Sequence, residues 1–281
     1  MYDGIRRACG PAEHKTAPIK AKDGTLLTDK QGQMRRWEEH YTDLYSTESQ
    51  LSNHARVNMP QMPTVTSLDD PPSIEEVRTA TESLSSGKAS GQDGIPAELI
   101  KSCKSVLLPS IHKLIVRCWE EGRMPQDFKD AKIVTIYKNK GDRSDCNNHR
   151  GISLLSVVGK LFARVVLRRL QVLAEEVYPE SQCGFRRDRS TIDMIFTLSL
   201  LKEKCREQHQ PLFMAFIDLT KAFDLVSREG MYTVLQKIGT PPRLLAVIQA
   251  FHDGMKGTVQ FDGTISESFP IQNGVKQGCV R

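Results

Sequence analysis

The sequence predicts an α+β protein in which helices outnumber strands. Three observations predict this class. Residues 156–177 form a strong amphipathic pattern, one of several at helical spacing. "AKIVTIYK" (131–138) alternates and is rich in β-branched residues, and "LFMAFIDL" (212–219) is a short apolar run bounded by polar turns. The alternating segment is predicted to be a strand ending at a lysine, and the apolar run a buried strand.

The first 72 residues are predicted to be a separate, weakly ordered lead-in. Within it, residues 29–46 place Met34, Trp37, Tyr41 and Leu44 at helical spacing, and prolines between 60 and 72 indicate a linker. The compact part begins at Ser73, which forms an S-x-x-E capping box with Glu76 at the start of a helix.

Further helices and a hairpin are expected along the rest of the chain. One long helix is predicted from Pro96 to about Gly122. The helix at 156–177 carries Arg164, Arg168 and Arg169 on its expected polar side. The remaining expectations are a helix capped by Ser190 or Thr191, two helices over 227–239 and 241–254, and a β-hairpin around the "DG" of 257–271.

Charge and composition limit the classes of protein. The net charge is +5, yet residues 129–189 alone hold 13 Lys/Arg against 7 Asp/Glu, which suits a polyanionic partner or, equally well, a solvated helix face. Seven scattered cysteines without a C-x-x-C pair argue against a disulfide framework and a zinc site, and favour an intracellular compartment, nuclear or cytoplasmic. No signal-peptide pattern and no run of about 18 apolar residues occurs, so no membrane partner is expected.

The segment "AFIDLTKAFDLV" (215–226) raises the question of what Asp218 binds. A carboxylate at the end of a buried strand usually binds a metal or another cation, although a purely structural aspartate is the commoner case for the pattern alone. In an extended chain Asp218 and Asp224 would lie roughly 20 Å apart, at about 3.3 Å per residue. Because phosphoryl-transfer sites place two metals about 4 Å apart, Asp218 needs a partner carboxylate from elsewhere in the chain.

A second set of candidate residues lies past the predicted strand at 131–138. Lys138, Lys140 and Arg150 would meet at the tip of a hairpin, an arrangement suited to a triphosphate, since arginine binds phosphate bidentately and lysine supplies point charge. An exposed basic hairpin without a ligand is the alternative.

The order of five sequence blocks resembles the reverse transcriptase domain of non-LTR (LINE-type) retrotransposons, which is also similar to that of group II intron enzymes. The blocks are "LSSGKASGQDGIPAELIK", "FKDAKIVTIYKNKGDRSDCNNHRGISLL", "ESQCGFRRDRSTIDMIF", "FMAFIDLTKAFDLV" (motif A) and "GVKQGCV" (the start of motif B). One departure is Gly151, where the family usually has proline, a change expected to loosen the hairpin.

The resemblance implies a right-hand polymerase fold and a role for each candidate. Residues 1–72 would be the lead-in, 73–210 the fingers with N-terminal helices, and 211–281 a partial palm with an incomplete antiparallel sheet. Asp218 would be the catalytic carboxylate and bind Mg²⁺ together with the Leu219 carbonyl, and Phe223 would be the steric gate that favours deoxynucleotides, leaving Asp224 structural. The incoming deoxynucleoside triphosphate would contact Lys138, Lys140, Arg150, Gln277 and Gly278, and the RNA template and DNA primer would contact Arg186, Arg187 and Arg189.

The partner carboxylate that Asp218 needs is not found. In this family it lies in an [FY]-A-D-D turn after motif B, and no D-D pair occurs downstream of Asp218. We therefore expect a fragment of an RNA-directed DNA polymerase that binds Mg²⁺ weakly or not at all, is poorly soluble and is inactive alone. Two alternatives stay open: a non-catalytic nucleic-acid-binding remnant that uses the basic fingers, and an inert helical protein that binds no RNA.

Overall fold

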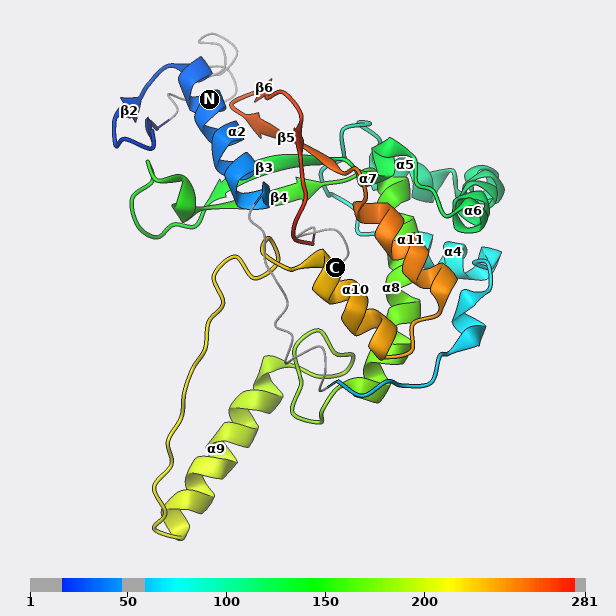
Figure 1. The fold of residues 1–281 in the computed structure, drawn as a ribbon, viewed down its shortest axis with the longest axis vertical. Coiled ribbons are helices and arrows are strands. Elements are labelled where there is room, and N and C mark those ends of the chain that lie inside the picture. The colour runs from blue at the N-terminus through cyan, green and yellow to red at the C-terminus, as the bar shows by residue number, and fades with distance from the viewer. Residues whose placement is uncertain (1–16, 47–58, 276–281) are drawn as a thin grey trace, which may run out of the picture.

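The computed structural model describes residues 17–46 and 59–275 and has a mixed helical and sheet architecture (Figure 1). A small sheet lies beside α2 on one side and a group of helices on the other, and α9 projects away from both (Figure 1). None of the helices described is long and apolar enough to cross a membrane. The helices are α2 (Lys30–Ser46), α4 (Ile74–Glu82), α5 (Ala97–Ser102), α6 (Lys104–Glu121), α7 (Gln126–Lys129), α8 (Val157–Val177), α9 (Thr191–Glu207), α10 (Arg228–Lys237) and α11 (Pro242–His252), and the strands are β1 (Ile19–Lys20), β2 (Leu26–Leu27), β3 (Ala131–Tyr137), β4 (His149–Leu154), β5 (Lys256–Phe261), β6 (Thr264–Ile265) and β7 (Phe269–Pro270).

Local signals start and end these helices as predicted. Ser73 and Glu76 form the capping box of α4, and Ser190 forms another with Asp193 at the start of α9. The helix predicted from Pro96 to Gly122 is instead two helices, because the chain leaves helical geometry at Cys103, where ψ is 19°. Gly122 ends α6 in the left-handed conformation, as glycine at a helix C-terminus usually does.

The central sheet of the described residues is mixed, with the order β4–β3–β5–β6 and with β7 also paired to β5. The antiparallel β3–β4 pair confirms the predicted basic hairpin, and β5–β6 confirms the hairpin at the "DG" turn. However, β3 and β5 run parallel, so the expected antiparallel palm sheet is not what the described residues form. Parallel strands need a long crossover, which the chain between β4 and β5 supplies with helices α8–α11.

Two apolar clusters make the core. One joins α4, α6, α8 and α11, with Trp119, Phe162 and Phe251 among its largest side chains. The other packs α2 against the sheet, where Trp37 is completely buried. Residues 30–46 of the lead-in are therefore built into the sheet's core and are not part of a separate, weakly ordered segment, because the apolar stripe of α2 has the sheet to cover.

The strand predicted at 212–219 is absent: these residues have no regular secondary structure. Phe213, Phe216 and Ile217 are 91%, 84% and 85% exposed. A strand needs a partner for its backbone groups, and the strands of the described residues pair with one another and not with this segment. In Figure 1 the segment runs back beside α9, a helix that has no buried residue.

Arg169 corrects the prediction that it lies with Arg164 and Arg168 on the polar side of the helix. Its guanidinium is buried, forms a two-fold hydrogen bond with the carboxylate of Glu76, and lies 4.7 Å from the ring centre of Trp119. Helical periodicity placed Arg169 on the polar side, but a paired arginine can be buried where an acidic side chain meets it.

Candidate nucleotide-binding site

The β3–β4 hairpin positions the three basic residues that the sequence singled out. Its register places Arg150 opposite Ile136, and beyond the last strand pair the Lys138 N–H still donates to the Asn148 carbonyl at 2.9 Å. The Lys138 ammonium donates to the Asn147 carbonyl at 2.9 Å. Lys140 lies in the following turn and is exposed, as is Arg150. All three cations are thus exposed, and the hairpin's own backbone holds one of them, Lys138, in place.

The turn within motif A faces this hairpin across a pocket. Residues 218–224 contribute one wall, Lys138, Lys140 and Arg150 contribute another, and the pocket has a volume of about 590 Å³. The structure thus brings together six of the predicted site residues: Asp218, Leu219, Phe223, Lys138, Lys140 and Arg150. Asp218 is exposed, and Phe223 is 38% exposed with its ring edge-on to Phe185 at a centroid distance of 6.2 Å.

Lys221, His40 and Tyr41 are among the residues of this pocket that were not predicted site residues. Lys221 stands on the motif A turn and its ammonium donates to Asn147 Oδ1 at 3.2 Å, while His40 and Tyr41 reach the pocket from α2. The signal for Lys221 was present, since it lies inside the motif quoted above. No sequence signal places α2 at this pocket, because that contact is between segments far apart in the chain.

Burial governs the charges on the pocket's inner side. Burial lowers the pKa of Lys221, and Lys138 lowers it further while Asp224 opposes the change. Burial raises the pKa of Asp224, although the hydrogen bond from the Tyr45 hydroxyl and the charges of Lys221 and Lys138 act to lower it. Burial, with the charges of Lys221 and Arg36, lowers the pKa of His40 to about 4, so this imidazole is neutral at pH 7. The pocket therefore combines fixed positive charge with one exposed carboxylate, Asp218.

The residues that could bind a divalent metal are few. Within the described ranges no three His, Cys, Asp or Glu side chains gather into a metal-binding cluster. The Asp224 carboxylate accepts from the Tyr45 hydroxyl at 3.1 Å, as fits the structural role expected for it. Mg²⁺ commonly binds through one or two carboxylates together with substrate phosphates and water, and Asp218 beside the basic hairpin fits that mode of binding and no fully protein-made cage.

The three arginines predicted to bind template or primer differ in exposure and in their ion pairs. Arg186 is 13% exposed and pairs with Glu175 at 2.9 Å, and Arg189 pairs with Glu180. The Arg187 side chain is 89% exposed and forms an ion pair with its neighbour Asp188, so it is the most exposed of the three. Gln277 and Gly278 lie outside the described residues.

Gly151 stands where the hairpin meets α2. A Cβ at this position would lie 2.9 Å from both Cε1 and the hydroxyl oxygen of Tyr41, a buried ring. The absence of a side chain thus permits close packing of the hairpin on α2, which gives a physical reason for glycine where the family usually has proline.

We expect Gly151→Ala to lower the free energy of unfolding by about 1–3 kcal/mol, the usual cost of forcing an extra carbon into a packed site. Urea denaturation followed by circular dichroism measures it. Gly184→Ala is the matched control, because its new Cβ would meet only the flexible Gln182 side chain at 3.3 Å. Equal effects of the two changes would contradict the packing of Tyr41 on the hairpin.

The fold and the pocket define a class of protein: a mixed helical and sheet domain in which a basic hairpin faces a carboxylate-bearing turn, as suits a phosphate-rich ligand with its metal. Residues 136–281, more than half of the chain, match the family described as reverse transcriptase (RNA-dependent DNA polymerase). The chain therefore belongs to the reverse transcriptase family, and the proteins it resembles are reverse transcriptases of non-LTR retrotransposons.

Three relatives illustrate the match. The chain is 25% identical over 265 residues to the transposon TX1 uncharacterized 149 kDa protein of Xenopus laevis, covering 92% of this chain and 20% of that protein. It is 28% identical over 209 residues to the RNA-directed DNA polymerase from mobile element jockey of Drosophila melanogaster (74% and 23%). It is 27% identical over 237 residues to the putative 115 kDa protein in type-1 retrotransposable element R1DM of Drosophila melanogaster (82% and 22%). The chain spans about a fifth of the length of these relatives.

Proposed function

We propose that this chain supplies the nucleotide-binding fingers and part of the palm of an RNA-directed DNA polymerase. The observation that carries the proposal is the 590 Å³ pocket in which Lys140 and Arg150 of the β3–β4 hairpin face the turn that bears Asp218 and Phe223. The substrate is a deoxynucleoside triphosphate, and the reaction is its template-directed addition to a primer.

Each wall of the pocket has a distinct role in this proposal. Lys138, Lys140 and Arg150 bind the triphosphate, with Lys221 as a further cation on the opposite wall. Asp218 and the Leu219 carbonyl bind Mg²⁺ together with the phosphates, and the bound metal neutralises charge on the transferred group. Phe223, which lines the same pocket, is the steric gate in this proposal, its ring excluding a ribose 2′-hydroxyl. Gln277 and Gly278 complete the nucleotide site in this proposal.

The nucleic-acid partners are an RNA template and a DNA primer. Arg187 is the most available of the three arginines proposed to contact their phosphates, since Arg186 and Arg189 form ion pairs with Glu175 and Glu180. Binding through such contacts weakens as salt rises, because it releases counterions from the nucleic acid.

The test is binding of a fluorescent deoxynucleoside triphosphate to the 281-residue chain, with and without Mg²⁺. We expect Lys140→Ala and Arg150→Ala each to weaken binding about tenfold, the equivalent of one charge-assisted hydrogen bond. Asp218→Asn should remove the part of the affinity that depends on Mg²⁺ and leave the rest. Both cations are exposed, so these substitutions leave the fold intact.

Lys113→Ala is the matched control, because Lys113 is an exposed lysine on α6, outside the pocket. Equal affinities of the Arg150→Ala and Lys113→Ala variants would overturn the proposed site. If the wild-type chain bound RNA with a strong salt dependence and bound no nucleotide, the result would favour a non-catalytic nucleic-acid-binding protein instead.

A further inference from the structure

The end of helix α2 contacts the turn that carries Phe223. Tyr45, in the last turn of α2, is buried, and its hydroxyl donates to Asp224 Oδ1 at 3.1 Å across 179 residues of sequence. Its ring stacks on Tyr41 at 6.2 Å between centroids, and Tyr41 stacks on Trp37 at 6.0 Å. These rings stand four residues apart on one face of the helix and fix the Tyr45 side chain in place.

Tyr45 also binds a second segment, residues 271–275. Its backbone carbonyl accepts from the N–H groups of Gln272 and Asn273 at 3.3 and 3.2 Å. This segment then donates to the turn itself: the Val275 N–H bonds to the Phe223 carbonyl at 2.8 Å, and the Gly274 N–H to the Val226 carbonyl at 2.9 Å. Residues 271–275 therefore bond the Phe223 backbone directly, and α2 bonds the neighbouring Asp224 through the Tyr45 hydroxyl. Residues 271–275 and α2 are themselves joined at the Tyr45 carbonyl.

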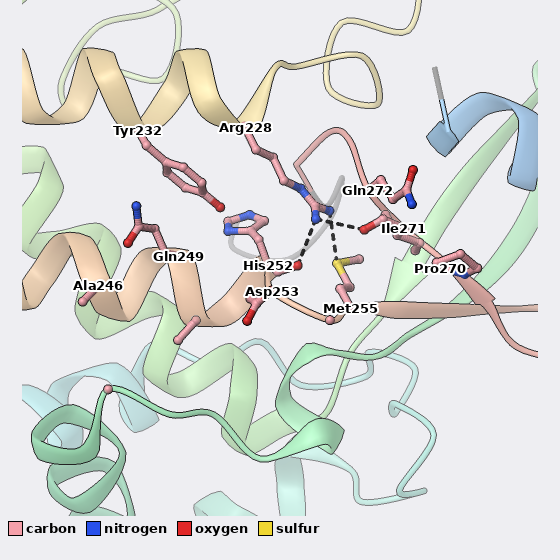
Figure 2. Close-up of a pocket in the computed structure, with 13 residues that line it drawn as sticks. Arg228, Tyr232, Ala246, Gln249, His252, Asp253, Met255, Pro270, Ile271 and Gln272 are labelled. Atoms are coloured by element: carbon pink, nitrogen blue, oxygen red, sulfur yellow. Dashed lines mark hydrogen bonds between the residues drawn. The ribbon is translucent and has the colours of Figure 1, made fainter. Parts of the chain in front are cut away.

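Arg228 holds the same segment from α10. Its guanidinium donates to the carbonyls of Ile271 and His252 at 2.9 Å and of Gly274 at 3.1 Å, beside a cavity of about 780 Å³ (Figure 2). Figure 2 shows this side chain reaching from α10 to the end of α11 and to the chain after β7. The segment that bonds Phe223 is thus fixed on two sides.

Gly274 shows how closely the segment and the turn approach. It has φ of 78°, and a Cβ there would overlap the backbone carbonyl of Asp224. Only glycine meets both conditions without strain. The turn bearing Phe223 consequently has little freedom to shift relative to residues 271–275. The hydrogen bond from Tyr45 restrains it from the side of α2.

We infer that Tyr45 is a positioning residue of the nucleotide pocket, which fixes the Phe223 ring through Asp224 and so sets the discrimination between deoxyribose and ribose. This inference rests on the proposed function, in which Phe223 is the steric gate. It assigns to α2, a helix that precedes the matched family region, a part in substrate selection.

The experiment measures affinities of the 281-residue chain for dGTP, GTP and inorganic tripolyphosphate, each with Mg²⁺. Tyr45→Phe removes one hydroxyl and keeps the ring in its stack. We expect the ratio of dGTP to GTP affinity to fall by about twofold to tenfold, the equivalent of one net hydrogen bond, with tripolyphosphate binding unchanged. A role in stability alone would weaken all three ligands together and leave the ratio as it was.

Two further variants keep the test specific. Tyr178→Phe is the matched control, because Tyr178 lies at the exposed end of α8. Asp224→Ala should lower the ratio as Tyr45→Phe does, and the double variant should lower it no further if the two act through one hydrogen bond. Additive effects, or a ratio unchanged in Tyr45→Phe, would overturn the inference. A wild-type chain that binds neither nucleotide would overturn the proposed function itself, and the inference with it.

Discussion

Replacing Trp37 with alanine is expected to lower the free energy of unfolding by about 3–5 kcal/mol, the range found for buried tryptophans. The indole is completely buried between α2 and the sheet. It stacks on Tyr41 and meets the His149 ring edge-on at 4.9 Å and the Phe261 ring at 5.8 Å. Its loss would leave a cavity between a helix and two strands that surrounding side chains can fill only in part.

Urea denaturation followed by circular dichroism measures this loss, and two conservative variants sharpen it. The indole N–H of Trp37 has no hydrogen-bond partner among the described residues, whereas that of Trp119 donates to the Asp69 carbonyl at 3.1 Å. Trp37→Phe should therefore cost at least about 1 kcal/mol less than Trp119→Phe, which breaks a bond. A Trp37→Ala variant as stable as the wild type would contradict the packing of α2 on the sheet.

Features fixed by neighbouring residues were predictable from the sequence. The capping box of Ser73, the cap at Ser190 and the "DG" turn each depend on a few adjacent side chains and backbone angles. The basic hairpin belongs with them, because β-branched alternation and a short connection determine it locally. The same locality made Lys138, Lys140 and Arg150 identifiable as one group.

Features that depend on distant partners were not predictable. The apolar run at 212–219 has the composition of a buried strand, yet burial requires a neighbouring strand, and none among the described residues pairs with it. Tyr45 has an ordinary local sequence, and only the folded chain shows that it contacts Asp224. Lys221 lies inside motif A, but its contact with Asn147 is likewise shown only by the folded chain. Residue patterns indicate that a face is apolar or basic, but they do not indicate what lies against it.

Arg169 leads to the second large effect. We expect Arg169→Met to destabilise the chain by about 3 kcal/mol, near the lower end of the cost of removing one partner from a buried ion pair, because Glu76 keeps some access to water. The guanidinium donates to both Glu76 oxygens, at 2.8 and 2.9 Å, and to the Leu68 carbonyl at 2.9 Å. Methionine fills much of the volume but leaves these acceptors without their donor.

Arg168→Met is the matched control, since this adjacent arginine is more exposed than Arg169 and its guanidinium donates to the Thr79 carbonyl at 3.3 Å, with no carboxylate partner among the described residues. Its effect should stay within about 0.5 kcal/mol. Urea denaturation of the two variants side by side gives the difference. Comparable losses would show that the buried guanidinium adds nothing beyond helix packing, contrary to the contacts described.

The same ion pair makes stability depend on pH. Burial alone would raise the pKa of Glu76, but the hydrogen bonds from Arg169 and from the Ser73 N–H outweigh it and lower the pKa below the ordinary value of 4.5. As the pH falls, the unfolded chain takes up this proton first, so the stability from the pair is present above about 4.5 and is lost as the pH drops through the folded pKa. Thermal unfolding between about pH 6 and pH 3 should therefore show a steeper fall in midpoint for the wild type than for Arg169→Met, whose Glu76 has lost the guanidinium. Parallel curves would mean that Arg169 does not lower the pKa of Glu76 in the folded chain, and that it stabilises the fold through its contacts with Trp119 and the backbone carbonyls alone.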